Sequence, residues 1–258
     1  MSHGPLSWPP RVQFPEASHD PRAEAVLSSR AALWLDRMGL LVAARRVRHR
    51  LFPDHESLRF PTYAREVAKL VRDSGDPTRY ASLALACTTL EQEGIAGEFA
   101  EVGVYRGATS RFLAACAPGR TLHLFDTFEG FARRDREPEN ASDTRFQATS
   151  EATVRRALGA ATNAAVIHPG YFPATTKGLD EKTFAFVLLD LDVYAPTLAG
   201  LEFFYPRLAR GGYCFVHDYN SPESNRACRR ALHEFLAGKP ERVIELPDTW
   251  GSAVFRKV

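Results

Sequence analysis

Two short motifs place several ionisable side chains within a few residues of one another. Asp190 and Asp192 are separated by one leucine at the end of an apolar run, and His217 is followed directly by Asp218 at the end of the next such run. Clustered carboxylates repel one another unless a cation lies between them. Because carboxylate oxygens are the ligands that a hard divalent ion prefers, the two motifs favour a divalent-metal site.

A purely structural interpretation of these acids also remains open. Asp190 and Asp218 each precede a segment of helical composition, so either side chain could cap the helix that follows. The metal interpretation assumes that the chain is still extended at Asp192, because side chains of an extended strand alternate between its two faces. In that case Asp190 and Asp192 would lie on one face.

The elements around these motifs alternate between strands and helices. We expect short apolar strands at 98–104, 121–126, 164–168, 184–192 and 212–218, separated by helices near 108–116, 149–159, 195–209 and 222–237. This order is typical of parallel strands joined by helical crossovers. The final runs, 241–246 and 251–258, are separated by only four residues and should pair antiparallel. The sequence thus predicts an α/β fold with an open, mostly parallel sheet and an antiparallel C-terminal hairpin.

In such a sheet, ligands bind beyond the carboxyl ends of the strands. The first strand ends with Glu101, Gly103 and Gly107, and we expect the two glycines to let a ligand approach the backbone. A carboxylate before this turn suits an amine-bearing ligand, whereas a dinucleotide-binding turn would have the pattern GxGxxG, which the turn lacks. The same glycine spacing would also be found in a tight strand-to-helix turn that binds nothing.

The next two strand ends are candidates for binding a nucleoside. Asp126 lies about twenty residues after the first turn, where an acid commonly binds a ribose diol, although it could also cap the next helix. After the third strand, Gly170, Tyr171 and Phe172 could form an adenine slot, and the two aromatic residues could equally belong to the core. The polar segment 132–147 is interpreted as a mobile lid or a disordered loop.

With these motifs in the same order, residues 75–258 resemble the macrocin O-methyltransferase family. The resemblance is carried by EFAEVGVYRGAT, FDTFEGF, GYFPATT, the stretch from LLDLDVYAP to VHDYN, and LPDTWGSAVFRK. This family consists of class I S-adenosylmethionine-dependent sugar O-methyltransferases. The resemblance implies a Rossmann-like fold with a seven-stranded sheet, and an acceptor that is a deoxyhexose carried as a nucleotide sugar such as a dTDP-deoxyhexose. A sugar already attached to an aglycone and a catechol-type acceptor are the alternatives, and an NAD-dependent oxidoreductase is the rival from another class.

The resemblance also implies roles for individual residues. Asp190 and Asp218 would be metal ligands, and His217 stands where the family commonly has a second acid, so it could be a third ligand or a base. His217 or Asp192 would then remove the proton of the acceptor hydroxyl, with Mg²⁺ as the expected ion, and Asp192 could instead be a further ligand. The candidate cofactor-binding residues are Glu101, Gly103, Tyr105, Arg106, Gly107, Thr109, Ser110, Asp126, Thr127, Phe128, Gly170, Tyr171, Phe172 and Asp190. Arg133, Arg134 and Arg136 could meet a diphosphate.

Composition limits the remaining possibilities. The chain has 258 residues, 45% of them hydrophobic, with a formal net charge of +2, which gives no reason to expect nucleic-acid binding. No apolar run approaches the ~18 residues of a membrane helix, and four dispersed cysteines argue against a disulfide framework. We expect a reduced, cytoplasmic enzyme that forms a homo-oligomer. Residues 1–74 are expected to form an N-terminal helical extension, a lid or an oligomer contact, ahead of the domain at 75–258.

Overall fold

The computed structural model describes Met38 and residues 65–136, 138 and 142–258. Residues 63–258 form one compact unit. Helix α4 (Arg65–Arg72) belongs to this unit, although the sequence analysis assigns residues up to 74 to the extension. Apart from Met38, residues 1–64 of the predicted extension lie outside the described residues.

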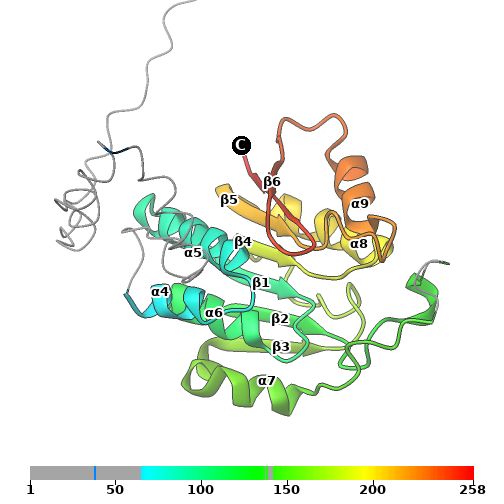
Figure 1. Ribbon diagram of the computed structural model, residues 1–258, viewed down its shortest axis with the longest axis horizontal. Helices are drawn as coiled ribbons and strands as arrows, with labels where there is room; N and C mark the ends of the chain where they lie inside the picture. Colours follow the sequence, from blue (N-terminus) through cyan, green and yellow to red (C-terminus); the bar gives the residue numbers. More distant parts are fainter. Residues whose placement is uncertain (1–37, 39–64, 137, 139–141) are drawn as a thin grey trace, which may run out of the picture. The chain divides into compact units, whose positions relative to one another are not determined.

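A seven-stranded sheet runs through the described part of the chain, in the order β3-β2-β1-β4-β5-β7-β6 (Figure 1). The first five strands pair in parallel, and β7 runs antiparallel to both β5 and β6. The predicted parallel sheet with an antiparallel C-terminal hairpin is therefore confirmed. The strands are β1 (Glu98–Val102), β2 (Leu122–Asp126), β3 (Ala165–Pro169), β4 (Phe184–Leu189), β5 (Leu208–Val216), β6 (Ile244–Leu246) and β7 (Ser252–Arg256).

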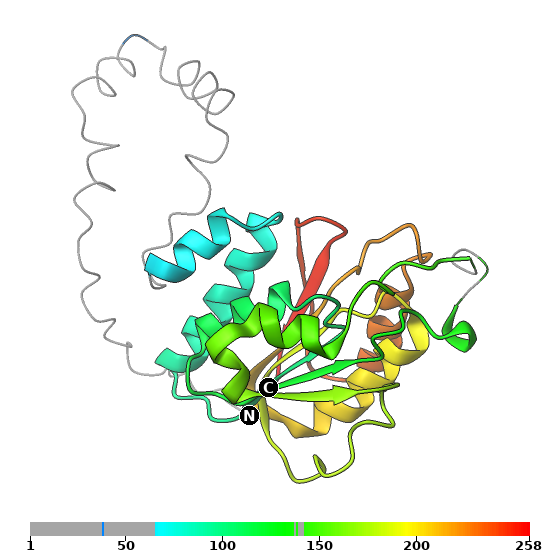
Figure 2. The same ribbon diagram turned by 90° about the horizontal axis from the view of Figure 1, so that it is seen from below.

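Helices cover both faces of the sheet (Figures 1 and 2). One layer contains α4 to α7, which contact one another in sequence, and α8 and α9 pack together on the opposite face. The helices after α4 are α5 (Pro77–Gln92), α6 (Ala108–Cys116), α7 (Glu151–Leu158), α8 (Tyr194–Phe204) and α9 (Ala227–Leu236). Asp76 caps α5 through the backbone N–H of Arg79, with Pro77 in the first turn.

The centre of the sheet is apolar on both faces because each face is covered by helices. All six residues of β4 are buried, which explains why this strand is a continuous apolar run rather than an alternating one. Phe204, the last residue of α8, packs edge-to-face or stacked against Phe125, Phe172 and Phe184. These contacts pack α8 against β2, β4 and the segment that follows β3.

The strand carrying Asp190 ends earlier than predicted. β4 stops at Leu189, although the backbone N–H of Asp190 still donates to the carbonyl of Val102 at 2.8 Å. Asp192 has φ of +60°, a left-handed conformation that interrupts the extended chain. The argument that alternation puts Asp190 and Asp192 on one face is therefore wrong, and a turn directs the second acid.

Helix ends also differ from the predicted ranges. The segment 195–209 was expected to be one helix, but α8 ends at Phe204 and β5 already begins at Leu208. A 3-10 turn (Tyr205–Arg207) follows α8, with Tyr205 still in helical conformation, and the chain becomes extended at Leu208, which pairs with the first residue of β4. Likewise, the expected helix 222–237 begins only at Ala227, because residues 221–226 form turns.

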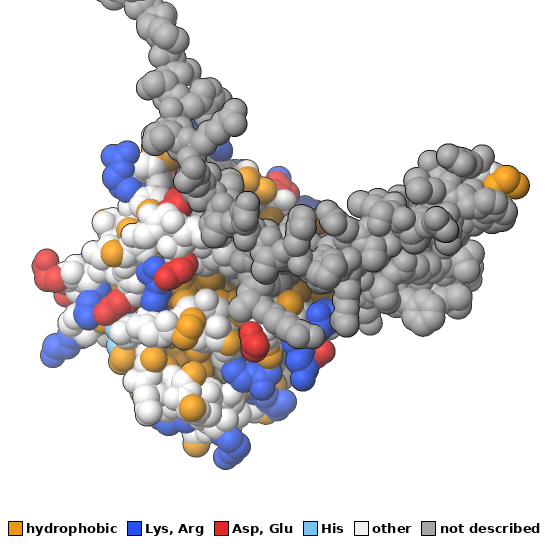
Figure 3. Space-filling model, turned by 90° about the vertical axis from the view of Figure 1, so that its left-hand side faces the viewer, with side chains coloured by type: hydrophobic (Ala, Val, Ile, Leu, Met, Phe, Trp, Pro, Cys, Tyr) orange, Lys and Arg blue, Asp and Glu red, His pale blue; other side chains and the backbone are white. Residues whose placement is uncertain are grey.

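The surface of the described part is mixed in charge. On the face shown in Figure 3, basic and acidic side chains alternate over the described residues, with hydrophobic side chains between them. All four cysteines are free thiols. Among the described residues, no helix has the length and apolar character needed to cross a membrane.

Candidate active site

A cleft of about 510 Å³ opens at the carboxyl ends of the parallel strands. It collects residues from every strand end singled out in the sequence. The predicted site residues that line it are Glu101, Gly103, Tyr105, Arg106, Thr109, Asp126, Thr127, Gly170, Tyr171, Phe172, Asp190, Asp192, His217 and Asp218. The topology thus brings the proposed cofactor turn and the acidic motifs into one cavity.

Gly107, Ser110 and Phe128 do not line this cleft. A Cβ on Gly107 would lie 3.3 Å from Val154 Cγ1, so this glycine makes room for α7. Ser110 is fully buried and donates a hydrogen bond of 2.5 Å to Glu101 Oε2. The sequence could not separate these three residues from their neighbours, because they belong to the same short motifs.

Gly103 allows a close approach of the protein backbone, whereas the sequence analysis expects a ligand to approach this glycine. A Cβ at this position, where φ is +89°, would lie 1.8 Å from the carbonyl oxygen of Asp190. The missing side chain therefore makes room for the protein's own backbone after β4, rather than for a ligand. Gly103 still lines the cleft, so the turn and the first acidic motif lie directly against each other.

Asp126 clamps the turn that follows β1. Its Oδ2 accepts hydrogen bonds of 2.8 Å from the backbone N–H groups of Val104 and Tyr105, and its Oδ1 accepts one of 2.7 Å from Phe128 N. The alternative that Asp126 caps the next helix is therefore wrong, since α7 is capped by Ser150. A carboxylate oxygen has two lone pairs, so Oδ1 retains capacity for a further hydroxyl donor.

Glu101 is a buried acid at the back of the cleft. Burial raises the pKa of its carboxyl to about 8, with the Ser110 hydrogen bond and Arg79 acting in the opposite direction. Near neutral pH a small change in surroundings can therefore change its charge. A positively charged amine next to Glu101 would favour the ionised carboxylate.

Asp190, His217 and Asp218 form a compact cluster in which one ligand atom from each lies within 4.8 Å of the others. His217 Nδ1 is 3.0 Å from Asp190 Oδ1 and 2.7 Å from Asp218 Oδ2. Although burial lowers it, the two carboxylates raise the pKa of His217 to about 10. The two carboxylates fit a divalent ion such as Mg²⁺ or Mn²⁺ by donor type, whereas a neutral imidazole is a more typical ligand of later transition metals. Without an ion, the imidazolium of His217 carries the balancing charge.

Asp192 lies beside this cluster in the cleft. Burial raises its pKa above the ordinary value, and the nearby charges of Asp218 and Asp190 raise it further. Burial likewise raises the pKa of Asp218. Several acids in one dry site disfavour each other's ionisation, which is the electrostatic condition that a bound cation relieves.

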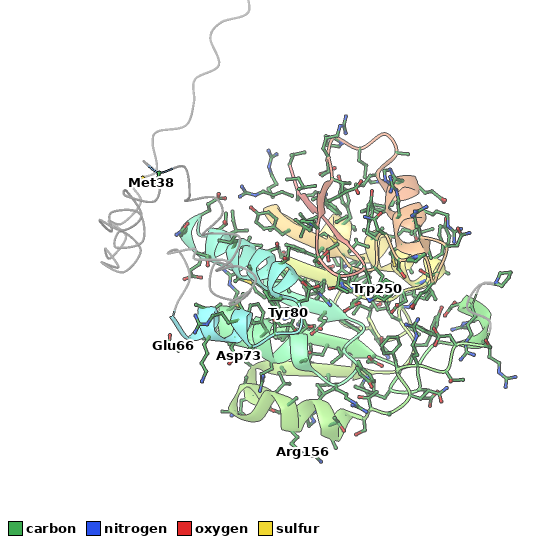
Figure 4. All side chains as sticks on the ribbon, in the orientation of Figure 1. Met38, Glu66, Asp73, Tyr80, Arg156 and Trp250 are labelled. Carbon is green, nitrogen blue, oxygen red and sulfur yellow. The ribbon has the colours of Figure 1, made fainter. Side chains whose placement is uncertain are left out.

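Three of the cleft residues that were not among the predicted site residues bring charge or an aromatic ring into it. Arg79 on α5 places Nη2 2.7 Å from Asp190 Oδ2, and Arg145 places Nη1 2.6 Å from Glu223 Oε2. Trp250 also lines the cleft and is 45% exposed, with φ of +68°; Figure 4 labels it in the loop between β6 and β7. Motif spacing in the sequence could not predict the ion pair, since Arg79 and Asp190 are 111 positions apart.

On the β2–β3 side, the aromatic residues divide between core and cleft. Phe172 is buried and stacks on Phe204 with a centroid distance of 5.9 Å, and Tyr171 donates to Asp135 at 2.9 Å. The guanidinium of Arg134 lies 3.7 Å from the centre of the Tyr171 ring. Arg136 donates to the carbonyl of Phe131, so these two arginines are engaged with protein groups.

Comparison with known proteins agrees with this geometry. Residues 75–252 match the family model of macrocin-O-methyltransferase (TylF). The chain belongs to this family. The family and its class, the S-adenosylmethionine-dependent sugar O-methyltransferases, were both predicted from the sequence and are confirmed, and the oxidoreductase alternative is dropped.

Two curated relatives of this TylF-family chain are O-methyltransferases from antibiotic biosynthesis. One is mycinamicin III 3''-O-methyltransferase of Micromonospora griseorubida, 31% identical over 174 residues that cover 60% of this chain and 67% of the relative. The other is 8-demethyl-8-(2,3-dimethoxy-alpha-L-rhamnosyl)-tetracenomycin-C 4'-O-methyltransferase of Streptomyces olivaceus, 29% identical over 172 residues that cover 61% of this chain. The match spans 64% of that second relative, slightly less than two thirds.

A solved structure shares the fold. The O-methyltransferase NovP superposes with a TM-score of 0.59 at 23% identity, covering 70% of this chain and 80% of that one. At this identity the likeness concerns the fold, and it agrees with the class I methyltransferase architecture that the sequence predicted.

Proposed function

We propose that this chain transfers a methyl group from S-adenosylmethionine to a hydroxyl of a deoxyhexose, and that the transfer requires a divalent metal ion. The observation that carries this proposal is the convergence of Asp190, His217 and Asp218 beside the Gly103 turn, in one cleft of a TylF-family chain. The two reactants of a methyl transfer must meet in line, and a single cavity spanning both motifs supports that arrangement.

The donor half of the cleft comprises the ends of β1, β2 and β3. S-adenosylmethionine supplies an electrophilic methyl group on a sulfonium centre. Glu101 is proposed to lie by the amino group of its methionine part, and Asp126 to accept a ribose hydroxyl while it holds the β1 turn. Gly170 and Tyr171 would border the adenine, because they line the cleft at the neighbouring strand end.

The acceptor half comprises the ends of β4 and β5. Asp190, His217 and Asp218 would hold the metal ion, which supplies Lewis acidity that lowers the pKa of a coordinated hydroxyl. We assign His217 as a ligand because its Nδ1 already faces both carboxylates. Asp192 is assigned as the general base, since it lines the cleft from the turn after β4 and is separate from this triad.

The form of the acceptor is the finer part of the proposal. The sequence analysis favours a nucleotide sugar, whereas the name of the Streptomyces olivaceus relative describes a rhamnosyl group already attached to a larger molecule. Trp250 borders the cleft near the end of β5, where its carbonyl accepts the backbone N–H of Asn220 at 3.0 Å, and it offers an exposed indole face to a sugar ring or aglycone. Homo-oligomer formation and a cytoplasmic location stay predictions.

The test is a labelled methyl-transfer assay with purified full-length protein. Acceptors would include dTDP-deoxyhexoses, deoxyhexosyl glycosides and a catechol, each with chelator and with added Mg²⁺. Transfer to a sugar that chelation stops and Mg²⁺ restores is the expected result. Full activity after exhaustive chelation contradicts the metal role, and transfer only to the catechol contradicts the sugar acceptor.

A further inference from the structure

Arg79 brings a positive charge into the cleft from helix α5, whereas the predicted site residues lie at or beyond the carboxyl ends of strands. It lies in the first turn of α5, its side chain is 12% exposed, and it lines the cleft. Its Nη2 lies 2.7 Å from Asp190 Oδ2, whereas its Nε is buried without a hydrogen-bond partner. One ion pair therefore satisfies only part of a guanidinium that has five N–H donors.

The position of this arginine is fixed by the start of its helix. Asp76 Oδ1 accepts the backbone N–H of Arg79, and Asp76 Oδ2 accepts that of Thr249 in the β6–β7 loop. The next residue, Tyr80, is hydrogen-bonded to Thr109 at the start of α6. The start of α5, which carries Arg79, is thus anchored to the β6–β7 loop and to α6.

The charges around Arg79 define what it can bind. Glu101 and Asp190 are both close enough to influence its pKa, which rises above the ordinary value even though burial lowers it. A ligand carrying a carboxylate at this end of the cleft would be repelled by both acids. The methionine part of S-adenosylmethionine carries an amino group and a carboxylate, so it requires a cation as well as an acid.

The other arginines that line the described part of the cleft are engaged elsewhere. Arg106 donates its Nε–H to the carbonyl of Ala148 at 3.0 Å. Arg145 is paired with Asp143 at 2.7 Å and with Glu223, on the acceptor side. Arg79 is therefore the arginine that lies between the donor turn and the first acidic motif.

We propose that Arg79 binds the α-carboxylate of the donor's methionine part while it keeps its ion pair with Asp190. This inference rests on the proposed function and extends it to a residue that determines donor specificity. Charge-assisted hydrogen bonds from a guanidinium to a carboxylate are among the stronger polar contacts in proteins. Arg79 would also link the two halves of the site, since the same side chain contacts the first acidic residue.

The experiment compares two donors that differ only in the carboxylate. Calorimetry would measure binding of S-adenosylmethionine and of decarboxylated S-adenosylmethionine to the full chain and to Arg79→Gln, in chelator and without acceptor. We expect Arg79→Gln to weaken binding of S-adenosylmethionine by roughly 10-fold to 100-fold, and binding of the decarboxylated donor by less than about threefold. Arg79→Lys should retain part of the preference.

Arg111→Gln is the matched control, because Arg111 is an exposed arginine on α6 outside the cleft. It should leave both affinities unchanged, and circular dichroism would check that each variant is folded. An equal loss for both donors would assign Arg79 a purely structural role and overturn the proposal, while the proposed function stands. Absence of donor binding by the unmodified chain would instead overturn the proposed function together with this role.

Discussion

The donor and acceptor halves of the cleft are organised by different kinds of interaction. Around β1 and β2, the carboxylate of Asp126 accepts three backbone N–H groups and fixes the turn. Around β4 and β5, Asp190, His217 and Asp218 hold one another through charge. The donor turn is therefore set by backbone geometry, whereas the acceptor end depends on the balance of ionised groups. Substitutions in the donor half should accordingly affect the stability of the fold, and substitutions in the acceptor half should affect methyl transfer.

The largest expected effect comes from the acceptor half. Asp190→Asn removes a charge from the proposed metal triad, and we expect methyl transfer to fall on the order of 10³-fold. The affinity for S-adenosylmethionine should change by less than about threefold, because the backbone-held turn remains. Single-turnover transfer and calorimetry would measure the two quantities. A large loss of affinity for S-adenosylmethionine with an unchanged single-turnover rate would contradict the assignment of Asp190 to the acceptor half.

The donor half should respond through stability. Gly103→Ala places a Cβ 1.8 Å from the carbonyl oxygen of Asp190, at φ of +89°. We expect a loss of about 3 kcal/mol or more in the free energy of unfolding, measured by urea denaturation. Gly119→Ala is the matched control, since φ is +92° and nothing lies within 4 Å of the added Cβ. It should cost about 1 kcal/mol, and equal costs would contradict the packing explanation.

Glu101 provides a test by pH. Its folded-state pKa of about 8 lies above the ordinary value of 4.5, so the native state retains the proton and loses stability as pH rises between these values. Relative to Glu101→Gln, the unmodified chain should lose on the order of 3 kcal/mol between pH 5 and pH 8. Denaturation of both proteins at the two pH values would measure this. Parallel stability curves for the two proteins would contradict the buried-acid assignment, and the exposed Glu202→Gln should behave as the unmodified chain.

The smallest expected effect concerns Trp250. Trp250→Ala removes the exposed indole at the edge of the acceptor half, and we expect the KM for the acceptor to rise roughly threefold to tenfold. The affinity for the donor should stay unchanged, and Trp250→Phe should recover most of the loss. Steady-state kinetics with a varied acceptor would measure it. A change in the affinity for the donor with an unchanged KM for the acceptor would contradict the assignment of Trp250 to the acceptor half.

The sequence predicts the fold and the meeting of the acidic motifs because both follow from local patterns. Apolar runs of strand length specify the order of elements, and the carboxyl ends of parallel strands must share one edge of the sheet. Asp190 and His217-Asp218 therefore converge as predicted, even though the expected strand to 192 ends at Leu189.

The rest of the site depends on contacts that no local pattern reports. The ion pair between Arg79 and Asp190 joins α5 to the residue that follows β4. Trp250 reaches the cleft through the antiparallel hairpin, and Gly103 is explained only by the backbone that packs against it. Each of these is set by how the helices and the hairpin pack on the sheet, which the spacing within a motif does not specify.

The central claim is that Asp190, His217 and Asp218 share one divalent ion beside the donor turn. The most direct measurement is a crystal structure of the full chain with S-adenosylhomocysteine and Mn²⁺, with the ion located by anomalous scattering. The account predicts a single strong peak within about 2.5 Å of a ligand atom from each of the three residues, with the thioether sulfur above Gly103. An ordered ligand in the cleft with no peak at this triad would contradict it.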